Sequence, residues 1–246
     1  IQRLVGSEMC IRDRPNAIYF DIDKNSDLNS NLPHMLPNKD MWEKIMSSNG
    51  ISNNDKIVVY DNSKVLSSCR LWYMLLYFGH SKKLVSVLNG GLEKWKKNNF
   101  PITEDHTRLK MTNYLAYENK FMVKNLDEID KNIENKVFSL VDARSKDRFE
   151  GKTKEPREGV RSGSIKNSIC IPFNNVIKDD KTFKDKEELK VIFNNIISDI
   201  DNNNVVFSCG SGITSCVLAL AYSLINNNYN PTIYDGSWAE YGKIFK

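Results

Sequence analysis

Cys209 stands at a point of the sequence where a cysteine can be a nucleophile. The apolar run 205–207 before it predicts a buried strand, and an apolar helical pattern begins near Val217. Between them lies a short loop with two glycines, and Thr214 or Ser215 is the expected N-cap of the helix. Backbone N–H groups and the positive end of a helix dipole meet in such a loop, so they favour a thiolate near neutral pH. The alternative is a structural cysteine buried at the start of a helix.

The residues after this cysteine restrict the reaction class. A cysteine-dependent phosphatase needs an arginine six positions after its cysteine to hold phosphate, and Ser215 stands there. The two positions directly after Cys209, Gly210 and Ser211, carry no charge. We expect Gly210 and Gly212 to let the backbone turn and to leave room for a substrate.

Composition excludes several function classes. The chain has 246 residues, 40% of them hydrophobic, and a net charge of +4. Its lysines are scattered among asparagines, so no nucleic-acid surface is expected, and no apolar run is long enough to span a membrane. The five cysteines form no C-x-x-C pair, which argues against a zinc site or a disulfide framework and for a reducing compartment.

Predicted strands and helices alternate along the chain, which is typical of parallel α/β domains. The expected strands are 17–20, 57–60, 84–88, 138–141, 169–171, 205–207 and 232–234. The expected helices are 38–48, 69–78, 92–97, 126–133, 187–197 and 217–224. A turn is expected at 235–238.

An internal repeat relates the two halves of the chain. Residues 58–63 match 206–211 in register, and residues 88–95 match 234–241. Asp61 falls where Cys209 falls, so the second copy keeps the nucleophile and the first copy has lost it.

The expected domain boundaries follow from the repeat. Residues 1–14 hold three of the nine arginines of an otherwise arginine-poor chain and resemble a translated sequencing adapter, so we treat them, with Cys10, as a foreign or disordered segment. We expect an N-terminal domain at 15–105, a linker at 106–124 and a catalytic domain at 125–246.

Several motifs occur together in one order. They are Asp21-Ile22-Asp23, His34-Met35-Leu36-Pro37, Leu88-Asn89-Gly90-Gly91, Arg148-Phe149-Glu150-Gly151, Glu155-Pro156-Arg157, Cys209-Gly210-Ser211-Gly212-Ile213-Thr214 and Tyr234-Asp235-Gly236-Ser237-Trp238. With them, residues 15–246 resemble the rhodanese superfamily, in particular its two-domain 3-mercaptopyruvate sulfurtransferases. The resemblance implies an α/β fold of tandem rhodanese-like domains, each a mainly parallel sheet flanked by helices, with an inactive first domain.

The chain also departs from the family pattern. Residues 164–168 replace a His-Ile-Pro-Gly-Ala-like run, and about 30 to 40 residues, roughly a strand and a helix, are expected to be missing from the first domain. The first departure touches no catalytic position, and the second bears on stability more than on chemistry.

The resemblance assigns roles to the residues of the loop and to two arginines. Cys209 attacks the sulfur of a donor and holds it as a persulfide. The substrate-binding residues are Arg148, Arg157, Gly210, Gly212, Ile213 and Thr214. Thiosulfate enzymes of the family carry an Arg-Lys pair directly after the cysteine, whereas the neutral pair here suits 3-mercaptopyruvate, whose carboxylate the two arginines would hold.

Asp23, His34 and Ser211 match the family's proposed relay. In it the carboxylate orients the imidazole, and the imidazole activates a hydroxyl that handles the thiol proton of the substrate. We expect Pro33 and Pro37 to hold His34 in an extended backbone. Without the resemblance, a lone histidine would be interpreted as structural.

The expected function is sulfur transfer from 3-mercaptopyruvate through the Cys209 persulfide to thiols, such as thioredoxin-like dithiols, or to cyanide, with release of pyruvate. No metal or organic cofactor is implied, and the location is expected to be cytoplasmic or mitochondrial. Cys69, Cys170 and Cys216 are expected in the core. The alternatives are a thiosulfate sulfurtransferase and a non-catalytic rhodanese-like module that binds a partner or senses redox state.

Overall fold

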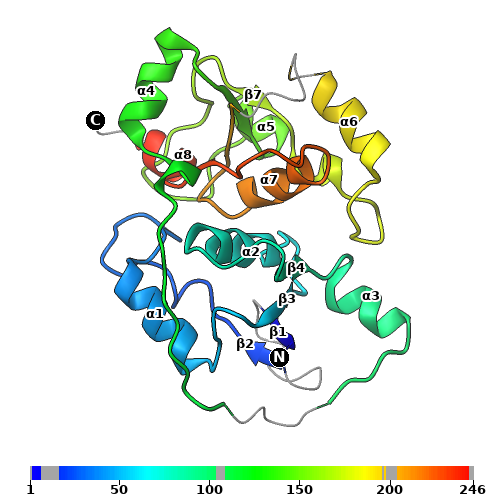
Figure 1. Cartoon of the computed structure of the whole chain (residues 1–246). Coiled ribbons are helices and arrows are strands. Elements are labelled where there is room, and N and C mark those ends of the chain that lie inside the picture. The colour runs from blue at the N-terminus through cyan, green and yellow to red at the C-terminus, as the bar shows by residue number, and fades with distance from the viewer. Residues whose placement is uncertain (1, 7–16, 104–108, 196, 198–203, 244–246) are drawn as a thin grey trace. The chain divides into compact units, whose positions relative to one another are not determined.

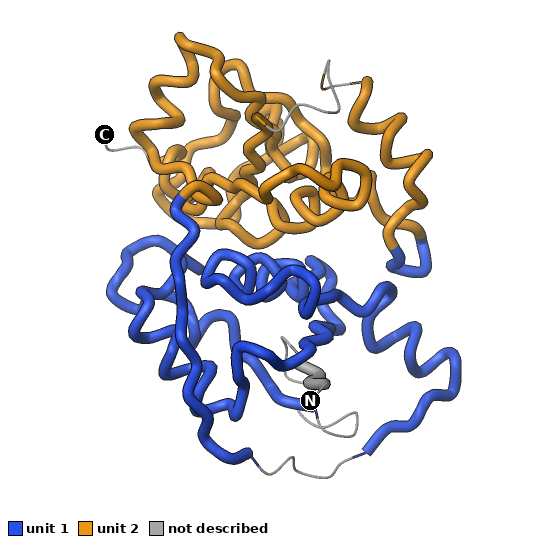
Figure 2. Tube along the Cα trace, in the orientation of Figure 1, with its two compact units in different colours: residues 1–120, 179–182 blue, residues 121–178, 183–246 orange. Residues whose placement is uncertain are grey.

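The computed structural model describes residues 2–6, 17–103, 109–195, 197 and 204–243. The chain forms two compact units, which Figure 2 shows in different colours. Unit 1 comprises residues 1–120 and 179–182, and unit 2 comprises residues 121–178 and 183–246. Each unit is an α/β domain with a parallel sheet, as the alternation of elements predicts.

Unit 2 is built on a parallel sheet with the strand order β5-β9-β8-β6-β7 (Figure 1). Its strands are β5 (Val123–Lys124), β6 (Ser139–Asp142), β7 (Ile169–Cys170), β8 (Val205–Ser208) and β9 (Ile233–Tyr234). Its helices are α4 (Leu126–Asn135), α5 (Lys146–Phe149), η2 (Phe173–Val176), α6 (Lys186–Asn194), α7 (Ser215–Ser223) and α8 (Ser237–Tyr241). The sequence predicts a turn at the position of α8, and no helix was expected at that of α5.

Helices cover both faces of this sheet because successive residues of each strand point to opposite faces. On β8, Val206 packs in a cluster with Ile129 of α4 and Trp238 of α8. The next residue, Phe207, points to the other face, where its ring lies 6.0 Å from that of Tyr222 on α7. A strand buried on both faces reads as a continuous apolar run, which is the pattern from which it was predicted.

Capping boxes fix the starts of α4 and α6. Asn125 accepts a hydrogen bond from the backbone N–H of Glu128, whose carboxylate accepts one from the Asn125 N–H in return. Asp185 and Glu188 make the same exchange at α6. Each N-cap side chain contributes about 1 kcal/mol to helix stability.

Unit 1 contains a parallel sheet with the order β2-β1-β3-β4. Its strands are β1 (Gln2–Gly6), β2 (Ala17–Tyr19), β3 (Lys56–Tyr60) and β4 (Val85–Val87). The order matches β7-β6-β8-β9 of unit 2, so the repeat inferred from sequence is also a repeat of topology.

The expectation that residues 1–14 take no part in the fold is wrong for β1. This strand lies between β2 and β3 and pairs with both in parallel, with Leu4 opposite Ala17 and Val58. The backbone groups along the inner edges of β2 and β3 need partners, and β1 provides them. The foreign origin of the segment stays a prediction, and Cys10 lies outside the described residues.

The helices of unit 1 are α1 (Lys39–Ser48), α2 (Ser68–Tyr77) and α3 (Gly91–Lys97). Trp42 of α1 is fully buried, and its ring stacks on Phe78 at 4.6 Å. Leu92 of α3 packs with Ala17 of β2 and Tyr60 of β3 in a second cluster. A helix of unit 1 therefore packs against its sheet, as α8 does in unit 2.

The segment expected as a linker is largely part of unit 1. Tyr114 and Ala116 are each 1% exposed, and the Tyr114 hydroxyl lies 3.2 Å from Nδ1 of His80. The N–H of Ala116 donates to the Glu43 carboxylate at 2.8 Å. Burial of alternate residues is typical of an extended segment on a protein surface. The polar residues between the buried ones made this segment resemble a linker in the sequence.

The unit boundary falls after residue 120, near η1 (Lys120–Met122), rather than at 124/125. Residues 179–182, expected in the second domain, belong to unit 1. There, Lys94 of α3 pairs with Asp180 at 2.9 Å.

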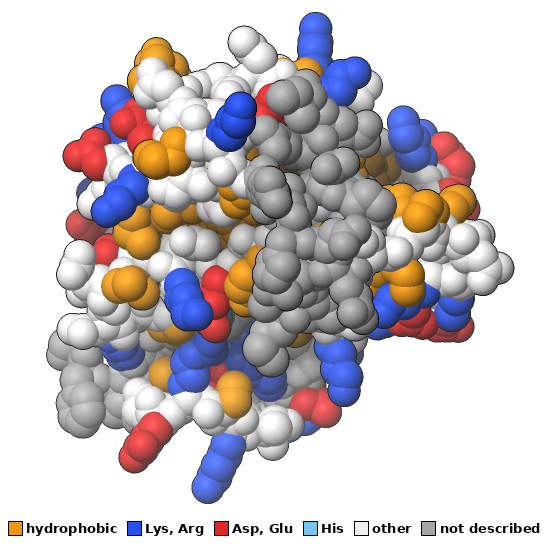
Figure 3. Space-filling view, turned by 90° about the horizontal axis from the view of Figure 1, so that it is seen from below, with side chains coloured by type: hydrophobic (Ala, Val, Ile, Leu, Met, Phe, Trp, Pro, Cys, Tyr) orange, Lys and Arg blue, Asp and Glu red, His pale blue; other side chains and the backbone are white. Residues whose placement is uncertain are grey.

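On the face shown in Figure 3, acidic and basic side chains are interspersed. Within the residues that the structure covers, no helix is both long and apolar enough to cross a bilayer.

Candidate active site

Cys209 directly follows the carboxyl end of β8, and the loop 209–214 joins that strand to α7. The cysteine is 1% exposed, and its Sγ lies 3.7 Å from the Ser215 hydroxyl. Burial raises the pKa of this thiol, but hydrogen bonds from the Thr214 hydroxyl, the N–H groups of Ser211 and Ser215 and the Ser215 hydroxyl together lower the pKa below its ordinary value. The loop therefore gathers the donors expected around Cys209, and its thiolate near neutral pH stays a prediction.

Helix α8 holds the loop 209–214 through backbone hydrogen bonds. The N–H of Trp238 donates to the carbonyl of Cys209, and the N–H of Ala239 donates to the carbonyl of Gly210, both at 2.9 Å. Ser237 accepts a hydrogen bond from the Cys209 N–H at 3.2 Å, and its hydroxyl lies 4.0 Å from Sγ. Sequence reasoning gave Ser237 no role beyond a turn.

The two loop glycines serve different purposes. Gly212 has a φ of 78°, a backbone conformation that favours glycine, as predicted. Gly210 needs no such conformation; a Cβ there would lie 3.2 Å from Nη2 of Arg148 and 3.6 Å from Nη1 of Arg157. Gly210 thus provides space for the two arginines. At the end of the loop, the carbonyl of Ile213 accepts a hydrogen bond from the N–H of Cys216 at 3.1 Å.

Arg148 on α5 and Arg157 in the following loop converge on Gly210, and their role in substrate binding stays a prediction. Nη2 of Arg157 donates to Oγ of Ser211 at 3.0 Å. The structure therefore brings together the Cys209 loop, the Ser211 hydroxyl and two guanidinium groups within unit 2. Two planar guanidinium groups offer paired N–H donors of the kind that suits a small anion.

His34 and Asp23 lie in unit 1. Nε2 of His34 is 3.0 Å from Oδ1 of Asp23, so the first contact of the expected relay is formed. The second contact, from His34 to Ser211, stays a prediction. His34 has a φ of 61° instead of the expected extended backbone. The expectation is wrong because a proline restricts the residue before it, whereas His34 comes after Pro33. The His34 carbonyl accepts from Nη2 of Arg70 at 2.6 Å.

Asp61 occupies in unit 1 the position that Cys209 occupies in unit 2. It directly follows β3, and its carbonyl accepts from the N–H of Leu92 at 3.1 Å, just as the Cys209 carbonyl accepts from Trp238. Leu92 and Trp238 are matched residues of the internal repeat. The same backbone contact therefore holds both loops.

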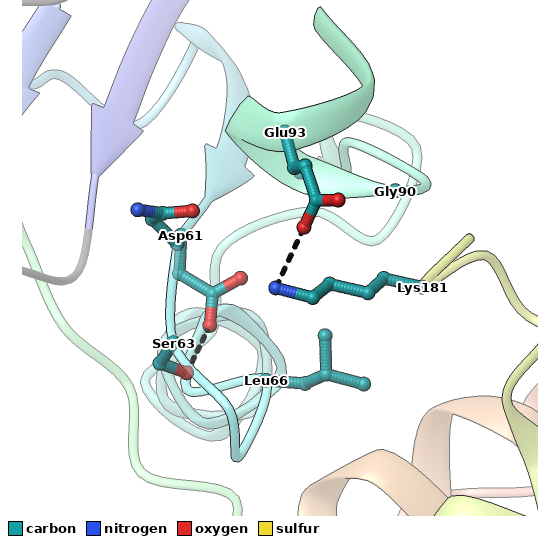
Figure 4. A pocket seen from close by; sticks show the side chains of 8 residues that line it. Asp61, Ser63, Leu66, Gly90, Glu93 and Lys181 are labelled. Carbon is teal, nitrogen blue, oxygen red and sulfur yellow. Dashed lines mark hydrogen bonds and ion pairs between the residues drawn. The ribbon is translucent and has the colours of Figure 1, made fainter. Parts of the chain in front are cut away.

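The side-chain chemistry of the Asp61 loop is different. The carboxylate is 4% exposed and accepts from the hydroxyls of Ser63, Ser67 and Ser68 at 2.6 to 3.1 Å. The adjoining cavity has a volume of about 10 Å³, room for about one water (Figure 4). Lys181 reaches the same hollow and pairs with a neighbouring glutamate. This loop contains no cysteine.

The remaining described cysteines form no disulfide. Cys69 and Cys216 are fully buried, as predicted, and the Cys216 thiol lies 3.3 Å from the carbonyl of Gly212. Cys170 was expected in the core but is only partly buried, at the end of the short edge strand β7; burial raises its pKa to about 11. The described part of the chain holds no group of three or more His, Cys, Asp or Glu side chains arranged for a metal ion.

A family model for the rhodanese-like domain matches residues 11–98 and 125–243. The chain belongs to the rhodanese family. It is 36% identical to thiosulfate/3-mercaptopyruvate sulfurtransferase 1, mitochondrial, of Arabidopsis thaliana, over 98% of this chain and 68% of the relative. It is 35% identical to 3-mercaptopyruvate sulfurtransferase of Mus musculus, over 94% and 77% of the two chains.

Solved structures agree with this membership. SseA of Escherichia coli, described as a 3-mercaptopyruvate sulfotransferase, has a TM-score of 0.83 and 28% identity over 96% of this chain and 92% of its own. Tum1 of Saccharomyces cerevisiae has a TM-score of 0.84 and 26% identity over 98% and 89%. The predicted tandem rhodanese-like fold is confirmed, and the protein is a sulfur-transferring enzyme of this family.

Proposed function

We propose that this enzyme takes sulfur from 3-mercaptopyruvate and carries it as a persulfide on Cys209. The observation that supports this most is the convergence of Arg148 and Arg157 on the uncharged Gly210, next to a cysteine whose pKa the loop lowers. The guanidinium groups suit the carboxylate of the donor. The absence of charge on Gly210 and Ser211 suits the neutral thiol that must approach Cys209.

In the first half-reaction, the Cys209 thiolate attacks the sulfur of the donor. An S–S bond forms, the C–S bond of the donor breaks, and the electron pair of that bond goes to the leaving carbon as pyruvate enolate. The donor's thiol proton ends on that carbon, so the products are pyruvate and the persulfide anion. Backbone N–H groups that stabilise the thiolate also stabilise this anion.

We assign the movement of the proton to Ser211, oriented by Arg157 and activated by His34 with Asp23. Its support is the formed His34–Asp23 contact and the Ser211 hydroxyl in the same loop as Cys209. In the second half-reaction, an acceptor thiolate or cyanide attacks the outer sulfur and releases the Cys209 thiolate. A dithiol of the thioredoxin type is the proposed acceptor, because its second thiol can displace the sulfur as sulfide.

Steady-state kinetics with both donors tests the proposal. We expect a higher kcat/KM for 3-mercaptopyruvate than for thiosulfate, and the reverse order would make the protein a thiosulfate sulfurtransferase. Mass spectrometry after treatment with the donor should show one added sulfur on Cys209, and none in Cys209→Ser. A wild-type protein that gains no sulfur from either donor would support a non-catalytic binding module.

We also propose a mitochondrial or cytoplasmic location. A relative from Arabidopsis thaliana is named mitochondrial, and described cysteines without disulfides suit a reducing compartment. Fractionation of the source cells with an antibody to this chain would test the location, and recovery in a secreted fraction would contradict it.

A further inference from the structure

Glu155 is a buried carboxylate in a polar loop of unit 2. Its side chain is 3% exposed, although most residues around it are solvent-exposed. It lies between Arg144, whose side chain is 0% exposed, and Arg148, whose side chain is 26% exposed. A buried charge needs close partners of opposite sign, and Glu155 has two.

Arg144 is held from several sides. Its Nε and Nη2 donate to Asp142 at the end of β6, at 3.0 and 2.8 Å, and Nη2 also donates to the carbonyl of Gly163 at 2.8 Å. Its guanidinium lies 4.5 Å from the ring centre of Trp238. Because Asp142 is the last residue of β6, these hydrogen bonds anchor the Arg144 side chain to the end of the sheet.

Glu155 transmits this fixed position to Arg148. Its Oε1 accepts from Nη1 of Arg144 at 2.8 Å and from Nε of Arg148 at 3.2 Å, and its Oε2 pairs with Nη2 of Arg148. Glu155 therefore contacts Arg148 at two points, and these two contacts fix the plane of the Arg148 guanidinium. That same Nη2 is the atom nearest to the position of a Cβ on Gly210.

We propose that Glu155 is a positioning residue for substrate binding, which holds the Arg148 guanidinium over Gly210 and is itself held by Arg144. The identity of the donor in this inference rests on the proposed function. Glu155 acts through Arg148 because both of its oxygens are used by arginines. Without its charge, two guanidinium groups would face each other with no carboxylate between them.

The kinetic signature of this role differs from that of a structural ion pair. The carboxylate of 3-mercaptopyruvate keeps its charge through the reaction, so Arg148 binds ground state and transition state alike. Loss of such uniform binding raises KM and leaves kcat nearly unchanged. A contact that only stabilises the fold would lower the melting temperature without a selective change in KM.

Glu155→Asp is the test variant, because it keeps the charge and withdraws the carboxylate by one methylene. The matched control is Glu158→Asp, an exposed glutamate of the same loop. We expect Glu155→Asp to raise KM for the donor about tenfold to a hundredfold, the range for a charge-assisted hydrogen bond, with kcat within about threefold. The rate of Cys209 alkylation should not change, since the donors around Cys209 do not include Glu155.

A double-mutant cycle with Arg148→Met decides whether the effect passes through Arg148. In the Arg148→Met background, Glu155→Asp should raise KM no further. An unchanged KM in the single variant, or an equal rise in both backgrounds, would overturn the positioning role. The wild-type comparison of the two donors tests the proposed function separately, and the cycle is then run with the preferred donor.

Discussion

The Thr214 hydroxyl is the side-chain donor with the largest effect in lowering the pKa of Cys209. Thr214→Val replaces it with a methyl group of nearly the same size and leaves the backbone N–H groups in place. A hydrogen bond to a charged group contributes about 1.5 to 3 kcal/mol. At any pH below the pKa, the thiolate fraction should therefore fall about tenfold to a hundredfold.

The assay is the rate of alkylation by iodoacetamide as a function of pH, followed by mass spectrometry of the Cys209 peptide. The rate–pH curve of Thr214→Val should move to higher pH and reach the wild-type plateau. Ser215→Ala should move the curve less, because the Ser215 hydroxyl has the smaller effect on this pKa. Thr232→Val, at the amino end of β9, is the control.

A Thr214→Val curve that coincides with wild type, in a protein with the wild-type melting temperature, would refute this account of the thiolate. The backbone N–H groups of the loop would then carry the stabilisation alone. An equal displacement in the Thr232→Val control would instead indicate a general effect of packing in unit 2.

Gly210→Ala should raise KM for the donor about tenfold with little loss of stability, because its Cβ would lie 3.2 Å from Nη2 of Arg148; an unchanged KM in donor titrations would contradict this. Asp61→Ala should lower the free energy of unfolding by about 1 to 3 kcal/mol, since it leaves buried serine hydroxyls without their acceptor, while kcat per folded enzyme stays at the wild-type value. Burial lowers the pKa of His80, so the unfolded chain takes up its proton first; denaturant titrations should show stability falling as the pH drops below about 6.5, and less so in His80→Gln.

Much of the fold and of the catalytic loop could be predicted because the signals are local. The strand before Cys209 is a short apolar run, and the helix after it is apolar on all sides. The repeat adds register, which places Asp61 and Cys209 at matching strand ends. These features depend on neighbours in sequence, which a single chain displays.

Features that depend on partners distant in sequence were missed. β1 was excluded on composition, but its place in the sheet follows from the backbone hydrogen bonds that β2 and β3 require. The role proposed for Glu155 is also hidden. Its partner Arg144 lies earlier in the chain, and the sequence does not show that the segment between them folds back to bring the two side chains together. The left-handed backbone of Ser237 could have been predicted from the repeat, because the residue matched to Ser237 is Gly91.

The two amides at the start of α8 give a way to watch the loop during turnover. The N–H groups of Trp238 and Ala239 donate to the loop carbonyls of Cys209 and Gly210, so neither can exchange with solvent deuterium until the loop leaves the helix. Their exchange rates, where they are faster than global unfolding allows, therefore report the separation of the Cys209 loop from α8, without a label on the cysteine. A comparison of sulfur-free and sulfur-loaded protein at these two positions would show whether the carried sulfur tightens or loosens the loop.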